Sequence, residues 1–413
     1  MNNNRTKLKS QLFYTGLFLY CVPTILQTTL LVETSYWNEL FVYLRYIAFY
    51  FGIVLIADEH IAFKDGKWFH PYLTDIRRSL WCFLILAVAG ISALVCGDRS
   101  FLACVIFIMA SGSIDLDDIV KAVLTMLSVT VMLTGGLCAY GVIEDLMFKR
   151  QDIPIRHALG FNYPSTMMSD LFFIVVLYCW VMKMELSLLD MLLIEVLNLI
   201  LFKLTDSRFG FLMIAVMTAG VYIFGLVRKK TGKKEIFAGR VWGFLVDGFG
   251  ILMTLVMAGM CAISRTGLGQ LLDRLLTKRI QYMTAGFRNY GVHLFGKNIQ
   301  WVGFGGSDNT DSLLESYNFV DNSYARILMN YGILIFILVL VILIVMSRAV
   351  RIQYQDGRII LVLCVLMYCF VEPRLTDIYV NPFLFAAAPF IRGTFLEKRN
   401  GKRSKKIKKT EYF

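Results

Sequence analysis

The sequence predicts an all-α polytopic integral membrane protein with about twelve transmembrane helices and one long, partly helical extracytoplasmic loop. Of the 413 residues, 57% are hydrophobic and only 17% are charged, and the mean hydropathy is +0.62. Soluble domains average roughly 45–50% apolar and about 25% charged residues, so a single water-soluble domain is excluded. The apolar runs are continuous, whereas strands of a transmembrane β-barrel alternate apolar and polar residues over about 10 positions.

Twelve apolar runs, separated by polar connections, predict the helices in order. They cover residues 12–31, 37–57, 79–96, 100–112, 119–142, 163–182, 186–203, 208–227, 240–263, 322–346, 359–371 and 379–391. A straight helix needs about 20 apolar residues to cross a bilayer, so the runs at 100–112, 359–371 and 379–391 are expected to be re-entrant or completed by a polar flank. The first run is longer than the roughly 7–15 residues of a signal-peptide core and lacks a small-residue cleavage site after it, so it is expected to remain as the first helix.

Lysine and arginine in the short connections predict that both termini are cytoplasmic, since loops rich in these residues stay on that side. The predicted cytoplasmic segments hold three basic residues at 1–10, four at 58–78, six at 228–240, three at 347–358 and nine at 392–413. Membrane helices 1–9 then occupy residues 1–263, the long outer loop 264–321, helices 10–12 residues 322–391, and a basic tail 392–413. The tail is expected to touch anionic lipid, and the protein to lie in the cytoplasmic membrane.

The charge balance and the cysteines exclude several other classes. The excess of 42 basic over 30 acidic residues, a net charge of +12, falls mostly between apolar runs as a topology signal, so nucleic-acid binding is not expected. The nine cysteines lie in or beside apolar runs and lack metal-ligand spacing, so neither a disulfide framework nor a zinc site is predicted. No DxD-like carboxylate cluster falls on the predicted outer side, and the sequence predicts no metal and no cofactor.

The long outer loop at 264–321 is expected to carry helices of its own. Connections longer than about 12–15 residues are usually functional or disordered, and this one contains the amphipathic stretch LGQLLDRLLTKRIQYM. Its leucines recur at helical spacing. We therefore expect helices that lie on the membrane domain.

Four arginines fall at helix ends on the predicted outer side: Arg156, Arg208, Arg279 and Arg374. Each one alone is explained by snorkelling to head groups or by capping a carbonyl. Together they favour a phosphate site, because a guanidinium offers a rigid fork of donors that suits phosphate oxygens. Arg208 is the most informative, since an arginine at the mouth of the membrane needs a partner or a ligand; Asp206 is the alternative, structural partner.

Residues 318–331 lead from the long loop into the next predicted helix. Asp321 or Asn322 is a natural N-cap, because its side-chain oxygen accepts from an unpaired helix N–H. Capping explains only one of these two residues. It also leaves Tyr324 and Arg326 in the following turn unexplained, so a binding role stays open beside the cap.

Glu372 and two histidines complete the polar residues of interest on the outer side. Glu372 ends an apolar run beside Pro373, and it is expected to neutralise Arg374 or an arginine of another helix. His157 and His293 are candidate bases by their pKa range, with a hydrogen-bonded structural role as the alternative.

In the order of these features the chain resembles the bacterial O-antigen and capsular polysaccharide polymerases of the Wzy type, relatives of the O-antigen ligases. The resemblance covers roughly residues 150–390 and runs through RHALGFNYPS (156–165), LTDSRFGFLMI (204–214), LLDRLLTKRIQY (271–282), LFGKNIQWVGFGG (294–306), VDNSYARILMNYGI (320–333) and VEPRLTDIYVNPFLF (371–385). Each motif is short and apolar-rich. Their order around one long outer loop is the more specific feature.

The resemblance implies a metal-independent inverting glycosyltransferase of the GT-C class with its active site at the outer face. Such enzymes transfer a growing glycan from undecaprenyl diphosphate to the non-reducing end of another lipid-linked repeat unit, in one pathway with a flippase and a chain-length regulator. By the resemblance, Arg156, Arg208 and Arg279 hold the diphosphate leaving group. Asp321 lies where the ligases carry a histidine, which favours a polymerase with Asp321 as acceptor-side base. The predicted substrate-binding set also contains Asn322, Tyr324, Glu372, Arg374, His157 and His293.

Two other functions stay open at this point. One is an O-antigen ligase-like transferase that passes a glycan from lipid to another acceptor. The other is a polysaccharide or lipid transporter, which is less favoured because many transporter folds contain repeated halves, whereas no internal repeat is visible here and the charges concentrate at one face.

Overall fold

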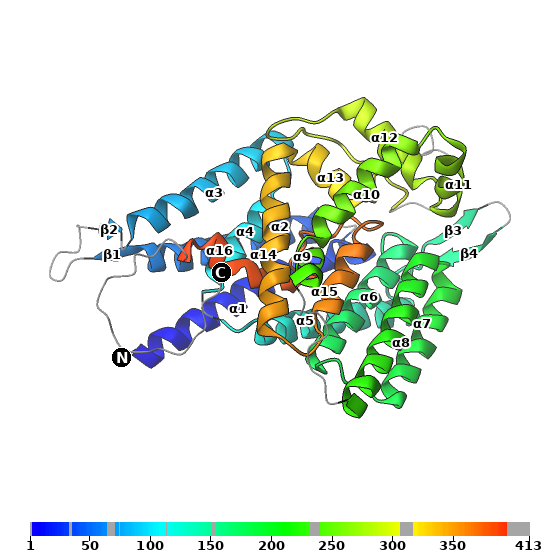
Figure 1. Ribbon diagram of the computed structural model, residues 1–413, viewed down its shortest axis with the longest axis horizontal. Coiled ribbons are helices and arrows are strands. Elements are labelled where there is room, and N and C mark those ends of the chain that lie inside the picture. Colours follow the sequence, from blue (N-terminus) through cyan, green and yellow to red (C-terminus); the bar gives the residue numbers. More distant parts are fainter. Residues whose placement is uncertain are drawn as a thin grey trace.

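A computed structural model describes residues 2–32, 35–63, 71–73, 75–112, 114–150, 153–231, 240–305 and 317–394 (Figure 1). The helices of the first half are α1 (Asn2–Leu26), η1 (Leu30–Val32), α2 (Ser35–His60), α3 (Ile76–Cys96), α4 (Ser100–Ala110), α5 (Leu116–Ala139) and α6 (Pro164–Val181). Those of the second half are α7 (Leu188–Thr205), α8 (Arg208–Thr231), α9 (Arg240–Asp247), α10 (Phe249–Ile263), α11 (Gly267–Leu275), α12 (Arg279–Tyr290), α13 (Ser323–Asn330), α14 (Gly332–Gln353), α15 (Ile359–Tyr368), η2 (Pro382–Ala387) and α16 (Ala388–Ile391). The described chain is therefore predominantly helical, as predicted.

Six of the described helices are long and apolar enough to cross a membrane: α2, α3, α5, α6, α8 and α14. The pair α9 and α10, bent by 64°, makes a seventh if it counts as one span. α4, α15 and the η2–α16 segment are the short apolar helices, and they coincide with the three runs predicted to be too short to span straight. α1 begins with a polar, basic turn and α7 carries charged residues within its length, and neither is among the six. The membrane character is thus supported, and twelve crossings stays a prediction.

Local sequence signals account for the helix boundaries. Asp75 caps α3 by accepting from the backbone N–H groups of Arg77 (3.0 Å) and Arg78 (3.3 Å). The same helix ends at Gly97, whose φ of +76° lies in the left-handed region that suits glycine. At the start of α7, Ser187 and Asp190 form a reciprocal capping box.

Two short hairpins were not among the predicted elements. β1 (Ile61–Phe63) pairs with β2 (Pro71–Leu73), and β3 (Met147–Arg150) pairs with β4 (Ile153–His157), both antiparallel. The physical reason for the second lies in its period-2 pattern. Phe148 is buried and packs edge-on against Tyr163, with ring centroids 5.2 Å apart, while exposed Met147 points to the other face.

The core is centred on α6. Two thirds of its length is buried (67%), against 22–44% for the other five long helices. It contacts α5, α7, α8 and α15, so every face of it meets another helix. This fits a helix that is apolar all round rather than amphipathic.

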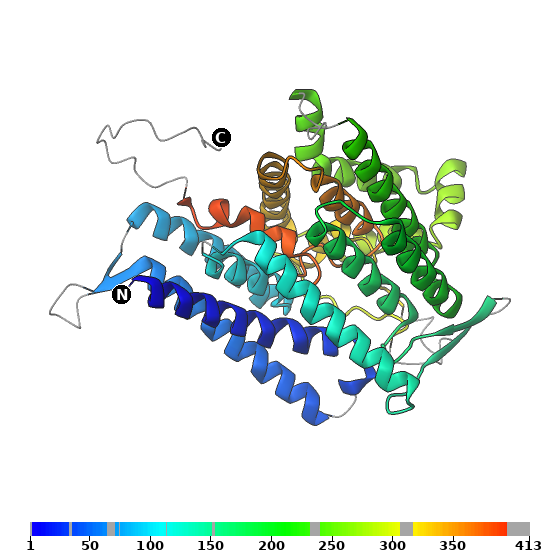
Figure 2. The same ribbon diagram turned by 90° about the horizontal axis from the view of Figure 1, so that it is seen from below.

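The polar connections gather at two ends of the bundle. At the basal end, ion pairs of Arg5 with Asp58 (2.6 Å) and of Glu59 with Arg78 and Arg392 join the start of α1, the end of α2, the start of α3 and the end of α16. The β1–β2 hairpin lies toward the same end, and the β3–β4 hairpin, α11 and α12 lie toward the opposite one, the loop end (Figures 1 and 2). Three of the five predicted cytoplasmic segments, those at 1–10, 58–78 and 392–413, thus share one end. Which end faces the cytoplasm stays a prediction.

The long outer loop is partly helical, as expected. The amphipathic stretch forms two helices, α11 and α12, rather than one, because Thr277 and Lys278 adopt left-handed φ values of +54° and +65°. Residues 306–316 of this loop and residues 395–413 of the basic tail lie outside the described residues, as do parts of the basic segments at 58–78 and 228–240.

Candidate functional site at the loop end

An ion pair between Arg279 and Asp321 lies at the centre of the loop end. Arg279 is the first residue of α12, and its Nε donates to Asp321 Oδ2 at 3.0 Å. Burial raises the pKa of the Asp321 carboxyl, and the Arg279 guanidinium opposes that rise. Both side chains are about one quarter exposed (27% and 26%), so the pair can meet a ligand from outside.

The segment that follows Asp321 is hydrogen-bonded to the loop after α15. Asn322 caps α13 by accepting from the Ala325 N–H (2.9 Å), and its amide donates to the carbonyl of Phe370 (2.9 Å). The hydroxyl of Ser323 donates to the backbone carbonyl of Glu372 at 2.6 Å. The cap predicted for one of two residues is therefore Asn322, and Asp321 is left for Arg279.

Glu372 joins this pair to form the Arg279–Asp321–Glu372 group. Burial raises the pKa of Glu372 to about 7 against the nearby positive charge of Arg279, and the negative charge of Asp321 adds to the rise. Among the described residues no ion pair or hydrogen bond to the Glu372 carboxylate is formed. A carboxyl that titrates near neutral pH and has no fixed partner is suited to proton transfer.

Arg374 pairs with a residue that the sequence did not single out. Its guanidinium donates to Asp170 on α6, and both side chains are almost fully buried (10% and 1% exposed). Of the two partners expected for Glu372, Arg374 is thus paired with Asp170 instead, and the positive charge that acts most on Glu372 is Arg279 of another helix. Asp170 takes that place because α6 packs against the end of α15, where Phe172 stacks on Tyr368 directly before the 369–377 loop. A charge within an apolar run was the available signal for Asp170.

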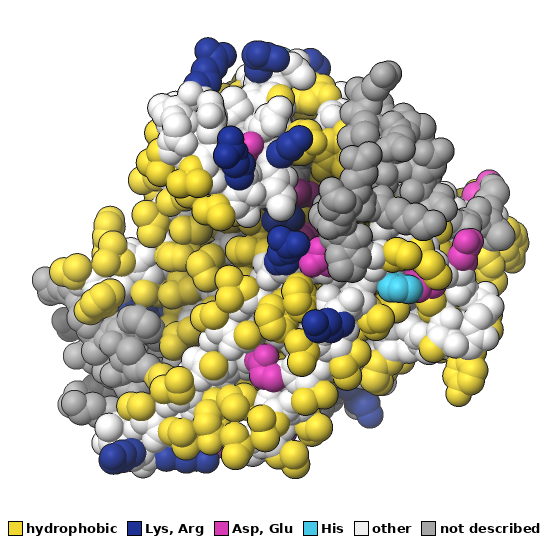
Figure 3. All heavy atoms as spheres, turned by 90° about the vertical axis from the view of Figure 1, so that its right-hand side faces the viewer, with side chains coloured by type: hydrophobic (Ala, Val, Ile, Leu, Met, Phe, Trp, Pro, Cys, Tyr) yellow, Lys and Arg dark blue, Asp and Glu magenta, His cyan; other side chains and the backbone are white. Residues whose placement is uncertain are grey.

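Arg208 has an exposed guanidinium at the start of the neighbouring helix. It begins α8, its side chain is 72% exposed, and its Nε lies 3.4 Å from Asp206 Oδ1. An exposed pair at that distance contributes little. The ring of Phe209 stacks on Tyr368 at the end of α15, with centroids 5.7 Å apart, which brings the start of α8 next to the loop that carries Glu372. Figure 3 shows basic and acidic side chains gathered in a hollow on this face, among apolar ones.

Arg156 has a structural role, and its guanidinium is not exposed to bind an anion. It is 6% exposed, its Nε donates to the Thr205 carbonyl at 2.7 Å, and its guanidinium lies 5.4 Å from the centre of the Tyr163 ring. These contacts tie β4 to the end of α7, just before Asp206 and Arg208. Arg156 therefore positions the Arg208 turn.

Three further predicted site residues lie in structural contacts. His157 Nδ1 is 2.6 Å from Asp145 Oδ2 next to the β3–β4 hairpin, and His293 Nε2 is 2.9 Å from the Tyr290 carbonyl. Tyr324 is fully buried and its hydroxyl donates to the Leu366 carbonyl at 2.9 Å. The structure brings none of the three into hydrogen-bond contact with the Arg279–Asp321–Glu372 group, so the roles predicted for them gain no support.

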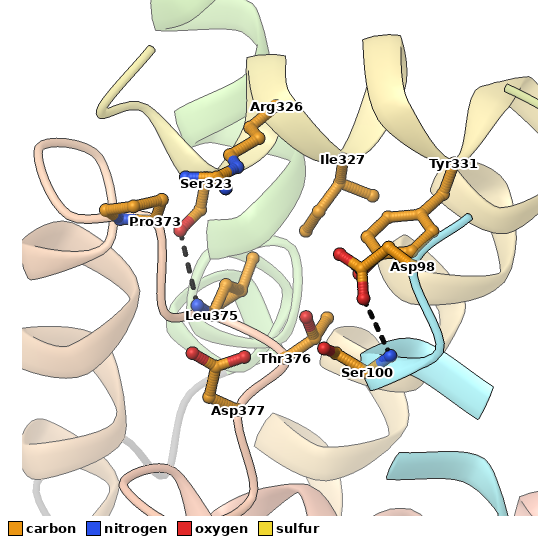
Figure 4. Close-up of a pocket in the computed structure, with 10 residues that line it drawn as sticks. All are labelled: Asp98, Ser100, Ser323, Arg326, Ile327, Tyr331, Pro373, Leu375, Thr376 and Asp377. Atoms are coloured by element: carbon orange, nitrogen blue, oxygen red, sulfur yellow. Dashed lines mark hydrogen bonds between the residues drawn. The ribbon is translucent and has the colours of Figure 1, made fainter. Parts of the chain in front are cut away.

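Two hollows flank the stack of Arg326 on Phe319, whose ring centre lies 4.6 Å from the guanidinium carbon. The first, the Arg326 cavity, has a volume of about 140 Å³ (Figure 4) and is lined by Asp98, Ser100, Ser323, Arg326, Ile327, Tyr331, Pro373, Leu375, Thr376 and Asp377. The second, the amide groove, measures about 610 Å³ and is lined by Gln27, Thr29, Val32, Asn38, Asn162, Gly303, Gly305 and Phe319. Sequence reasoning noted Arg326 but not the acids that face it, since they come from distant segments.

The described residues contain no cluster of three His, Cys, Asp or Glu side chains with the spacing of a metal site. The chain matches no protein-family model, no curated protein and no solved structure. Its function therefore has to be inferred from the site and from the motif resemblance. The site as described offers arginines for an anion, one carboxyl that titrates near neutral pH, and a polar cavity beside both.

Proposed function

We propose that the protein polymerises oligosaccharide repeat units linked to undecaprenyl diphosphate at the outer face of the cytoplasmic membrane. The observation that carries the proposal is the Arg279–Asp321–Glu372 group beside the exposed Arg208. Fixed cations and a proton acceptor side by side are what glycosyl transfer from a diphosphate requires.

The arginines serve the leaving group. When the bond between the anomeric carbon and the diphosphate oxygen breaks, its electron pair leaves with the diphosphate, which gains negative charge. Arg279 is held by Asp321 at a helix N-terminus, where the backbone also favours an anion. Arg208 has most of its guanidinium free for the same group. Asp321 is then a positioning residue for Arg279.

The acceptor hydroxyl needs a proton acceptor as its oxygen bonds to the anomeric carbon. Asp321 was the predicted base, but its carboxylate is bound to Arg279. Glu372 has no such partner among the described residues, and a pKa of about 7 matches the operating pH of a general base. We therefore assign the base to Glu372, and the proton moves from the acceptor hydroxyl to its carboxylate.

The test uses the purified full chain in lipid nanodiscs with undecaprenyl-diphosphate-linked repeat units as the only glycan. Wild-type protein is expected to produce a ladder of chain lengths on a gel. Arg208→Ala and Arg279→Lys are expected to lower the rate at least tenfold, because alanine removes the charge and the donors, and a lysine ammonium lacks the fork of donors. Arg288, exposed in the last turn of α12, is the matched control, and Arg288→Ala should leave the ladder intact.

Two results would contradict the proposal. One is a full ladder from both Arg208→Ala and Arg279→Lys. The other is wild-type protein that extends no lipid-linked glycan but transfers a single glycan to a different acceptor. That result would favour the ligase-like function instead. Movement of intact lipid-linked glycan across the membrane, without transfer, would favour a transporter.

A further inference from the structure

Arg326 carries a charge that no described residue neutralises by direct contact. Its guanidinium lies over the rings of Phe319 (4.6 Å) and Trp301 (5.3 Å). Within the described part of the chain it makes no side-chain hydrogen bond or ion pair. Aromatic contacts fix the plane of a guanidinium and leave its N–H groups available as hydrogen-bond donors. Those donors are available to the cavity that Arg326 lines.

Acceptors face Arg326 from the other walls of the cavity. Asp98 is held by the Tyr331 hydroxyl (2.6 Å) and the Ser100 N–H (2.8 Å). Asp377 comes from the loop after α15. Its carboxylate accepts a long hydrogen bond of 3.3 Å from the Tyr379 hydroxyl. Burial raises the pKa of Asp377 to about 6, so the carboxyl is largely ionised at neutral pH and accepts hydrogen bonds.

The Thr376 hydroxyl lines the same cavity and has no hydrogen-bond partner in the described part of the chain. Thr376 is 7% exposed, and no hydrogen bond of its hydroxyl is found within the described residues. In Figure 4 it lies between the Asp377 carboxylate and Ser100. The Thr376 hydroxyl oxygen is not among the fully buried polar atoms that lack a partner, so it is open to the cavity and can exchange hydrogen bonds with a polar ligand. Donor, acceptors and hydroxyl therefore converge on one small space.

We propose that the Arg326 cavity binds the hydroxyl-bearing edge of one neutral sugar residue, the terminal residue of the glycan that accepts the transferred chain. The inference rests on the proposed function, since it assigns one of its two substrates. Arg326 donates to sugar hydroxyls, and Asp98 and Asp377 accept from them.

Size and charge restrict the ligand. The Arg326 cavity, at about 140 Å³, has less than a quarter of the volume of the amide groove, at about 610 Å³, so it can take part of one sugar ring and excludes a folded oligosaccharide. Two carboxylates against one guanidinium repel a uronic acid or a phosphate. The wider amide groove on the other side of Phe319 has no charged residue in its lining.

The cavity shares a wall with the reacting group. Ser323 lines the cavity, and its hydroxyl donates to the Glu372 carbonyl at 2.6 Å. Asp321 precedes it by two residues. A sugar held by Arg326 and Asp377 therefore lies beside the backbone of the loop that carries Glu372, so the acceptor site and the proposed base belong to one segment of the chain.

The experiment measures binding of simple glycosides to the full chain in nanodiscs by saturation-transfer NMR. The probes are the methyl glycosides of glucose, galactose, mannose, rhamnose, fucose and N-acetylglucosamine, with the methyl glycoside of galacturonic acid as the charged member. We expect at least one neutral glycoside to bind at millimolar concentration and the galacturonide not to bind.

Two variants test the cavity, and one serves as the matched control. Asp377→Asn and Thr376→Val are expected to weaken binding of that glycoside at least tenfold and about threefold. Asn38→Ala, in the amide groove, is expected to leave it unchanged. Thermal unfolding of each variant shows whether the fold is kept. Thr376→Val is nearly isosteric, so it keeps the test decisive if Asp377→Asn unfolds.

The proposal is overturned if no neutral glycoside binds, if the galacturonide binds better, or if neither cavity variant weakens binding. Calorimetry with inorganic diphosphate on the same samples separates this inference from the proposed function. If glycosides bind and diphosphate does not, the sugar site is supported and the diphosphate-linked donor of the proposed function is contradicted. If diphosphate binds, Arg208→Ala abolishes that binding and no glycoside binds, the diphosphate-linked donor is supported and the sugar site is contradicted.

Discussion

At the scale of residues, the contacts of each guanidinium decide what an arginine at the loop end can do. The guanidinium groups of Arg156 and Arg374 donate to buried acceptors, so both residues stabilise the structure. Arg279 shares its charge with Asp321 and is still partly exposed. Arg208 is mostly in solvent. A buried arginine that loses its partner is left with an uncompensated charge, so of these four arginines only Arg279 and Arg208 are free to bind the leaving group.

The pKa of Glu372 leads to a prediction about pH. A carboxyl with a pKa of about 7 is neutral below that pH and accepts a proton only above it. We expect the wild-type polymerisation rate to rise with a midpoint near pH 7. Glu372→Gln should lower the rate at least about hundredfold and abolish the midpoint. Asp321→Asn should move the midpoint to lower pH, because the Asp321 charge raises the pKa of Glu372.

Rates measured between pH 5.5 and 8.5 on matched amounts of folded protein check this assignment. An unchanged midpoint in Glu372→Gln would exclude Glu372 as the base. Loss of activity at every pH in Asp321→Asn, together with an unchanged midpoint in Glu372→Gln, would return the role to Asp321.

At the scale of elements, short local signals set where the helices begin, and these starts set the site. The left-handed turn at Lys278 begins α12 so that its first residue is Arg279. The Asn322 cap begins α13 directly after Asp321. Two helix starts thus bring a cation and a carboxylate together, although 42 positions separate them in the sequence.

The cap at Asn322 yields a prediction with a matched control. Asn322→Ala removes both the cap and the bond to the Phe370 carbonyl, so we expect it to destabilise the fold by about 1–2 kcal/mol and to lower the polymerisation rate by displacing Asp321 and Glu372. Asp115→Ala removes the cap of α5 at the basal end, and it should cost similar stability without this loss of rate.

Thermal unfolding and the polymerisation rate, measured on both variants below their unfolding temperatures, compare the two effects. Equal losses of rate from Asn322→Ala and Asp115→Ala would mean that the cap acts only through general stability.

At the scale of the whole molecule, the charges divide between two ends. Ion pairs join three of the predicted cytoplasmic segments at the basal end, and the site residues meet at the loop end. The exposed apolar side chains lie along α2, α3, α7 and α8 between them. An apolar surface between two polar ends is what a bilayer accommodates.

The orientation in the membrane is open to a labelling test. Asn289, exposed at the end of α12, and Lys230, exposed near the end of α8, are each changed to Cys in a background without reactive thiols. We expect an impermeant maleimide added to intact cells to label Asn289→Cys, because the loop end is predicted to be outside. Lys230→Cys should react only after permeabilisation. The opposite pattern would reverse the orientation and move the site to the cytoplasm.

The sequence by itself determined the helical membrane class, the position of the short apolar segments and the residues of the loop end. Apolar run length and basic connections depend only on composition along the chain, so these features needed no structure. It did not determine the β3–β4 hairpin, whose strands are too short for a clear pattern, or which acids meet which arginines. Arg374 with Asp170, and Arg326 facing Asp98 and Asp377, are separated by tens to hundreds of positions. Only tertiary packing decides such pairs, because a charge carries no information in the sequence about which distant segment will lie beside it.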